Sequence, residues 1–142
     1  MELSPNFAYA HALLGAGYAY NSQAEAALQS IERALRLSPK DTFLDKFHVY
    51  ASLAHYQNES YDSAALSAEH ALRIRPQHPN THMLAAASNA MAGNDVRATR
   101  ALAEFGRLVP GTTLENVARA VAYERAEDRE KLVDGLRLAG LV

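Results

Sequence analysis

Apolar residues recur along the chain at intervals of three and four positions, in short segments separated by polar breaks. This spacing places the apolar side chains on one face of an α-helix, and few β-branched residues are available for a sheet. We therefore expect an all-α fold of about eight helices. The predicted helices span residues 6–20, 23–37, 43–57, 61–74, 80–92, 95–108, 113–124 and 127–138.

The polar breaks contain residues that start and stop helices. Side-chain oxygens of Ser, Thr and Asn can accept hydrogen bonds from the free N–H groups of a first turn, and a Glu three residues later completes a capping box. Gly93 suits the position just after a helix, where a left-handed backbone is common. The expected caps are Ser22 with Glu25, Ser60, Asn94, and Thr112 with Glu115.

Four prolines recur at a nearly constant interval. Their separations are 34, 37 and 34 residues, and each follows an aliphatic residue two positions earlier: Pro5, Pro39, Pro76 and Pro110. Proline lacks a backbone N–H and disfavours the helical conformation of the residue before it, so each one ends a helix. A period near 34 indicates stacked helix pairs. We divide a single domain, 1–142, into repeats 8–41, 42–78 and 79–112 and a degenerate capping pair, 113–142.

Equivalent positions of the repeats hold similar residues. Ala27, Ala64 and Ala98 share one position, where a small side chain lets a neighbouring helix approach closely. Each helix pair is expected to contact only its neighbours in the row. The last pair carries the densest charge, which suits the end of a row that faces water.

Composition excludes several classes of protein. The chain of 142 residues has a net charge of −2 and no cysteine, so disulfides and thiolate chemistry are excluded and no nucleic-acid partner is expected. The start shows no secretory signal. The longest uncharged stretch, 3–24, is interrupted by polar residues, proline and glycine, and it makes a poor membrane span. We expect a cytoplasmic protein that does not bind membranes.

The segments "LLGAGYAY" and "AEAALQSIERALRLSPKD", with their spacing, resemble the tetratricopeptide repeat (TPR) family. The first repeat matches the family pattern at Leu14, Gly15, Tyr18, Ala27, Ala34 and Pro39. The second keeps Tyr61, Ala64, Ala71 and Pro76, and the third keeps Gly93, Ala98 and Pro110. The resemblance covers essentially the whole chain and implies a right-handed α-solenoid of antiparallel helix pairs that acts as a protein-binding scaffold.

A second resemblance concerns the context of the domain. The segments "NFAYAHALLG" and "AEDREKLVDGLRLAGL" resemble TPR regions that follow bacterial adenylate/guanylate cyclase domains or winged-helix regulators. This likeness implies a docking or regulatory part of a larger signalling protein. Leu3-Ser4-Pro5 matches the end of a repeat whose helices are missing, which also favours a fragment of a longer array.

In the TPR family, the first helix of each pair lines a concave groove. The matching positions are almost uncharged and suit an apolar helix or extended segment of a partner. The selected groove candidates are Tyr9, Leu13, Tyr20, Lys46, Val49, Tyr50, Leu53, Tyr56, Met83 and Ala87, and Asn80 and Leu84 occupy equivalent positions. The alternative is that some of them, especially Leu13, Leu53 and Leu84, belong to the core between helices.

The predicted helix 6–20 is apolar on nearly every side. Phe7, Tyr9, Leu13 and Tyr20 cannot all face one neighbour, and a helix that is apolar all round is usually buried. We expect self-association through these four residues. The alternative function is therefore a structural module that dimerises the parent protein.

No pattern in the chain indicates catalysis. The histidines His11, His48 and His82 share one repeat position, but stacked helices hold equivalent residues roughly 10 Å apart, whereas a zinc ligand lies at about 2 Å. "GAGY" at 15–18 lies within a helical pattern rather than after a strand, unlike a phosphate loop. We expect no enzyme activity, cofactor, metal or small-molecule substrate, and a protein or peptide partner.

Overall fold

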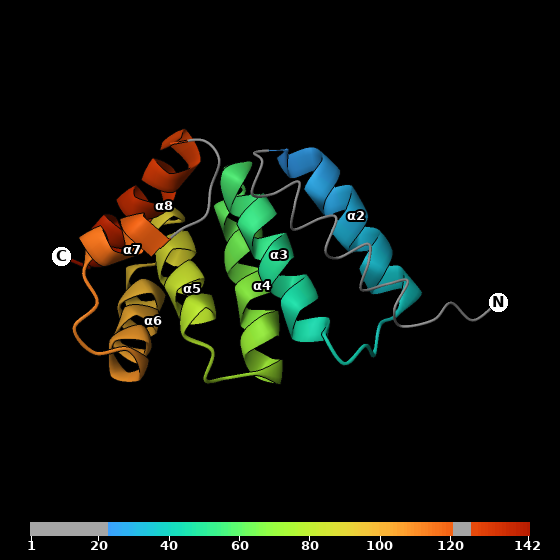
Figure 1. The fold of residues 1–142 in the computed structure, drawn as a ribbon, viewed down its shortest axis with the longest axis horizontal. Coiled ribbons are helices and arrows are strands. Elements are labelled where there is room, and N and C mark those ends of the chain that lie inside the picture. The colour runs from blue at the N-terminus through green and yellow to red at the C-terminus, as the bar shows by residue number, and fades with distance from the viewer. Residues whose placement is uncertain (1–22, 121–125) are drawn as a thin grey trace.

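A computed structural model describes residues 23–120 and 126–142. Within these ranges the chain forms seven helices and no strand, which confirms the all-α class. Figure 1 shows the helices following one another along the long axis of the molecule, from α2 to α7 and α8. Their bounds are α2 Ala24–Leu37, α3 Leu44–Gln57, α4 Tyr61–Ile74, α5 Pro79–Met91, α6 Asp95–Leu108, α7 Leu114–Ala120 and α8 Ala126–Ala139.

The helix bounds follow the sequence pattern closely. Helices α4 and α6 match the predicted ranges, and α2, α3, α5 and α8 differ by one residue at one or both ends. Gly93 ends α5 with a φ of +84°, which supports its expected place after the helix. Ser60 and Asn94 precede α4 and α6 as expected, although neither side chain bonds to the first turn.

The capping box predicted for the start of α7 is shifted by one residue. The pair is Thr113 with Asn116: the backbone N–H of Asn116 donates to Thr113 Oγ1 at 3.2 Å, and the backbone N–H of Thr113 donates to Asn116 Oδ1 at 3.1 Å. Thr112 instead donates its hydroxyl to the carbonyl of Val109. At the start of α2, Gln23 occupies the N-cap without a side-chain bond, and Ser22 lies outside the described residues.

Consecutive helices from α2 to α6 pack against one another, and the closest pairs are α3 with α4 and α5 with α6. Ala27, Ala64 and Ala98 are all buried, so the shared small position lies where helices meet. Ser52, also fully buried, donates its hydroxyl to the carbonyl of Ala64 and links α3 to α4. The packed helix pairs are consistent with a helical repeat.

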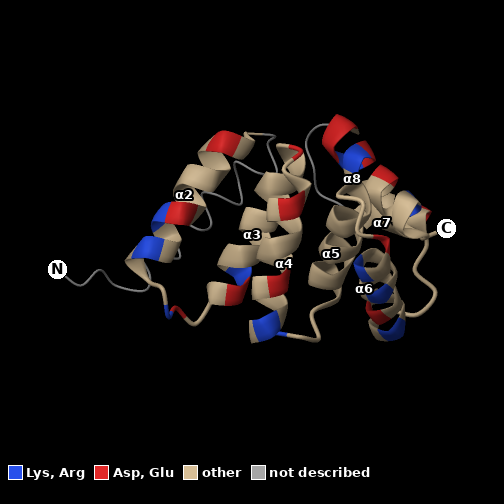
Figure 2. Ribbon diagram, turned by 180° about the vertical axis from the view of Figure 1, so that it is seen from behind, with Lys and Arg blue, Asp and Glu red and all other residues tan. Residues whose placement is uncertain are grey.

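Helix α5 forms the centre of the molecule. Its residues from Thr81 to Ala90 are all buried, and it contains no Lys, Arg, Asp or Glu, as the uniformly tan α5 in Figure 2 shows. It contacts α4, α6 and α8. Small side chains such as Ala86 and Ala87 leave room for these neighbours on several sides.

Helix α8 departs from the expected arrangement. It packs across α5 and also touches α6 and α7, and the hydroxyl of Tyr56 on α3 donates to the carbonyl of Lys131 on α8 at 2.6 Å. The last helix pair therefore reaches back to the second repeat. This finding corrects the expectation that each pair contacts only its immediate neighbours.

In the described ranges, no helix combines the length and the apolar character needed to cross a bilayer.

Candidate binding groove

A groove of about 500 Å³ lies between α3 and α5 and is bordered at one end by α7 and α8. We call it the α3–α5 groove. It is lined by Asp45, Lys46, Val49, Tyr50 and Leu53 of α3, His78, Pro79, Asn80, Met83 and Leu84 at α5, Phe105 and Val109 at α6, Thr112, Asn116, Val117 and Ala120 at α7, and Leu132 of α8.

The middle of the groove is apolar. Val49 and Leu53 are one helical turn apart, so they lie on the same face of α3, and Met83 and Leu84 face them from α5. Phe105, Val117 and Leu132 close the surface from the later helices and are buried. The unbranched thioether of Met83 can adapt to different shapes of ligand.

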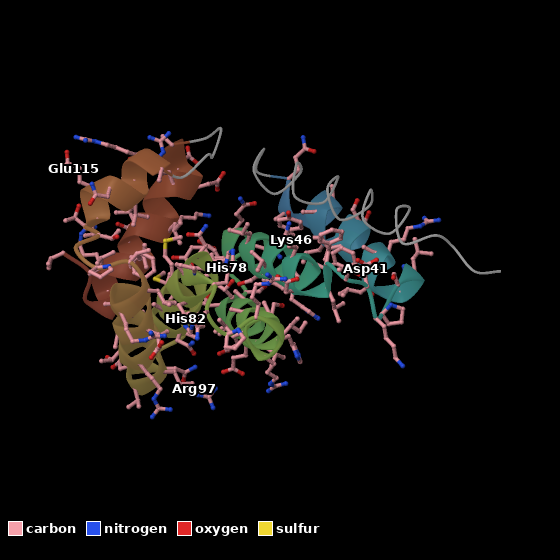
Figure 3. The ribbon with its side chains drawn as sticks, turned by 60° about the horizontal axis from the view of Figure 1, so that its bottom comes forward. Asp41, Lys46, His78, His82, Arg97 and Glu115 are labelled. Atoms are coloured by element: carbon pink, nitrogen blue, oxygen red, sulfur yellow. The ribbon has the colours of Figure 1, made fainter. Side chains whose placement is uncertain are left out.

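One end of the groove is polar. Asp45 is buried, and its Oδ2 accepts a hydrogen bond from Arg75 Nε at 3.0 Å, which forms an ion pair between α3 and the loop after α4. The ammonium of Lys46 lies 5.0 Å from the centre of the Phe43 ring, within range of a cation–π contact. Figure 3 shows Lys46 and His78 near each other in the middle of the molecule.

His78 lies at the junction of the polar end and the start of α5. Its Nδ1 is 2.9 Å from the hydroxyl of Thr81. Burial lowers the pKa of His78, and the positive charges of Arg75 and Lys46 lower it further, while Asp45 acts in the opposite direction. The neutral imidazole is therefore favoured here.

His48, His70 and His82 make contacts within the fold. The rings of His48 and His70 lie 5.1 Å apart between α3 and α4, and His82 Nε2 is 2.7 Å from the carbonyl oxygen of Pro76. Across residues 23–120 and 126–142, no three His, Asp or Glu side chains are grouped closely enough to hold a metal ion. His11 lies outside the described residues.

Lowering the pH below about 6.5 is expected to destabilise the fold. Burial lowers the pKa of His48, His55 and His78, and His70 adds to the effect at His48. The unfolded chain, with ordinary pKa values near 6.5, therefore binds more protons as the pH falls through this range, and the free energy of unfolding decreases. Urea unfolding at pH 7.5 and pH 5.5 measures the difference. His48→Gln should reduce it, and an unchanged urea midpoint would contradict this prediction.

The structure brings together half of the ten candidate groove residues. Lys46, Val49, Tyr50, Leu53 and Met83 line the groove, as do the equivalent Asn80 and Leu84. Tyr56 and Ala87 do not line it, because α8 covers both and they are fully buried. Tyr9, Leu13 and Tyr20, like Phe7 of the predicted self-association surface, lie outside the described residues.

Several lining residues were not among the sequence candidates. The polar end adds Asp45 and His78, and the late part of the chain adds Phe105, Val117 and Leu132. The repeat pattern offered no signal for the last three, because they reach the groove only through the way that the final helix pair packs. Asp45 could have been named from the sequence, since it adjoins the candidate Lys46 at the start of the same helix.

No family model matches the chain, and no match was found among the curated proteins.

Proposed function

We propose that this chain is a non-catalytic protein-binding module, built as a TPR-like α-solenoid, whose α3–α5 groove binds the apolar face of a helix. The helix belongs to a partner protein or to another domain of the parent chain. From the resemblances of the sequence, we place the module in bacterial cytoplasmic signalling. The groove of about 500 Å³ between α3 and α5 is the observation that carries the proposal.

The size and lining of the groove support a binding role. A volume of about 300–1,000 Å³ is usual for small-molecule sites, and an apolar lining with a few polar groups at the edge also suits the apolar face of a helix. The α3–α5 groove has this character, with Val49, Leu53 and Met83 in the middle and Lys46 and Asn80 at the polar end. The charged groups at that end are held by structural contacts, such as the ion pair of Asp45 with Arg75.

The neighbouring surface supports a helical ligand. Helix α8 already packs on the same side of α3 and α5, next to the groove, and Leu132 of α8 is part of the groove wall. Leu132 and Leu136 are one turn apart and fully buried. The adjoining α3–α5 groove offers an apolar surface of the kind that the apolar face of an amphipathic helix fits.

The repeat architecture is supported by three features of the described residues. Consecutive helices pack as neighbours, the position shared by Ala27, Ala64 and Ala98 is buried, and the prolines after α2 and α4 follow the ends of those helices. Solenoids of this kind expose extended surfaces for binding. The return of α8 onto α5 is the departure from a regular array.

Val49→Glu is expected to weaken ligand binding strongly. A carboxylate in the apolar middle of the groove would lose its hydration when a ligand closes over it. The chain would be used as bait to select peptides from a displayed random library. The selected peptides would then be synthesised and their affinity for the chain measured by calorimetry. We expect apolar residues at helical spacing in the selected peptides, and a loss of affinity of at least about tenfold in Val49→Glu, or about 1.4 kcal/mol.

Val96→Glu is the matched control, because Val96 is 72% exposed on α6 and is not part of the groove. It makes the same chemical change and should leave the affinity unchanged. Equal affinity of the two variants, or a library that yields no peptide that binds the folded chain, would refute the proposed groove.

A further inference from the structure

Helix α8 covers the part of the α3 and α5 surface that the repeat pattern assigns to a ligand. Tyr56 and Ala87 occupy groove positions in the sequence pattern, yet Gly135 of α8 lies directly on both. Leu132, on the same helix, also forms part of the wall of the α3–α5 groove. We call the surface of Tyr56 and Ala87 under Gly135 the α8 seat. The α3–α5 groove and the α8 seat are therefore two adjoining parts of one surface.

The fit of α8 depends on a small residue at one position. A Cβ added at Gly135 would overlap the hydroxyl of Tyr56 and would come within 3.0 Å of the Ala87 Cβ. Glycine therefore allows the backbone of α8 to approach α3 and α5 closely. Leu132 and Leu136 flank this contact and are fully buried.

The shortest polar contact of α8 uses a backbone group that any helix could offer. Tyr56 donates its hydroxyl to the backbone carbonyl of Lys131 at 2.6 Å. The ammonium of Lys131 lies 3.5 Å from the carbonyl oxygen of Gln57 and 3.7 Å from Glu59 Oε1. The main contact therefore recognises a helix backbone beside a small residue, and the lysine adds a weaker, partly exposed interaction.

The buried residues of α8 lie along one face of the helix: Asp128, Leu132, Gly135 and Leu136. The outer surface of α8 is charged and exposed at Glu130, Asp134 and Arg137, as the red and blue segments of α8 in Figure 2 show. Release of α8 would therefore break contacts on one side of the helix only.

We propose that α8 is a detachable occupant of the α3–α5 surface, and that a partner helix with a small residue between two leucines replaces it. Release of α8 would expose Tyr56 and Ala87, and the partner helix would then cover them. The ligand helix would then carry the same pattern as α8, with residues like Leu132, Gly135 and Leu136 at the same spacing. This inference rests on the proposed binding function and adds the ligand pattern and its competition with α8.

Hydrogen exchange of the 142-residue chain tests whether α8 detaches. We expect the amides of α8 to exchange through a local opening, at least about tenfold faster than those of α5. Equal protection of α8 and α5 under native conditions, with both exchanging only through global unfolding, would overturn the proposal. This measurement needs no ligand and no variant, so it stays decisive even if a variant does not fold.

A labelled peptide with the sequence of residues 126–139 tests replacement. In the Gly135→Ala chain the attached α8 no longer fits, so the peptide should bind at least about tenfold more tightly than it binds the unaltered chain. The same peptide carrying Gly135→Leu is the control and should not bind. A folded Gly135→Ala chain, verified by circular dichroism, that fails to bind the peptide would overturn the proposal.

The two proposals can fail separately. The binding function would stand and the detachable helix would be refuted by two results together: peptide binding that is lost in Val49→Glu, and α8 amides as well protected from exchange as those of α5. Faster exchange of α8 and binding of the α8 peptide, without any ligand whose binding is lost in Val49→Glu, would support the detachable helix and refute the proposed groove.

Discussion

Phe47→Ala should lower the free energy of unfolding by about 3–5 kcal/mol, the range measured for truncation of large buried side chains. The ring of Phe47 is 0% exposed and packs with Ala34 of α2, with Leu35, Leu37 and Leu44 at its edge. Its removal leaves a cavity at the contact between α2 and α3, where rigid helices cannot fully close the space. Urea unfolding followed by circular dichroism measures the loss.

Phe43→Ala provides the matched control for this substitution. Phe43 is the same residue type at the start of the same helix, but it is 37% exposed and its ring contacts Lys46. Its truncation should cost less than about 1 kcal/mol, as most substitutions away from the core do. A similar loss for the two variants would show that the burial of Phe47 between α2 and α3 does not account for its effect.

Leu136→Ala should lower the free energy of α8 opening by about 2–5 kcal/mol. Leu136 is 0% exposed and lies one turn after Leu132, next to the close contact of Gly135 with Tyr56. Loss of its side chain removes one of the two apolar anchors that hold α8 to α5. Hydrogen exchange at the α8 amides, compared between the variant and the unaltered chain, measures the change directly.

Leu138→Ala makes the same truncation on the other side of α8. Leu138 is 63% exposed, so the opening free energy should change by no more than about 0.5 kcal/mol. Equal effects of Leu136→Ala and Leu138→Ala would mean that burial against α5 does not hold α8 in place.

The sequence predicted the individual helices well because each one carries its own signals. The bounds of α4, for example, are marked by Ser60 before it and by Pro76 two residues after Ile74. These signals act over a few residues and depend little on the rest of the fold. The buried alanines at the shared repeat position were predictable for a similar reason, since their spacing matches the helix contacts.

The positions of the last helices were not predictable from the same signals. Periodicity shows which face of α8 is apolar, but it does not show which helix will cover that face. The contact of Gly135 with Tyr56 joins residues that are far apart in the chain, and nothing near either residue indicates it. Of the candidate groove residues, Val49 and Met83 consequently line the α3–α5 groove, whereas Tyr56 and Ala87 are buried.

The residues that cap α7 could not be predicted to the exact position from the local sequence either. Thr112 with Glu115 and Thr113 with Asn116 have the same spacing, and both pairs can in principle bond reciprocally with the first turn. The structure uses the second pair, while Thr112 bonds back to the carbonyl of Val109. A shift of one residue at a helix end is within the ordinary ambiguity of such signals.

The uncharged helix α5 has a consequence for synthesis of the protein in the cell. Ribosomes complete α5 well before α8, and at about 5–20 residues per second the delay is roughly 2–10 s. During that interval the alanine-rich side of α5, which later lies under Gly135 and Leu136, has no cover from α8.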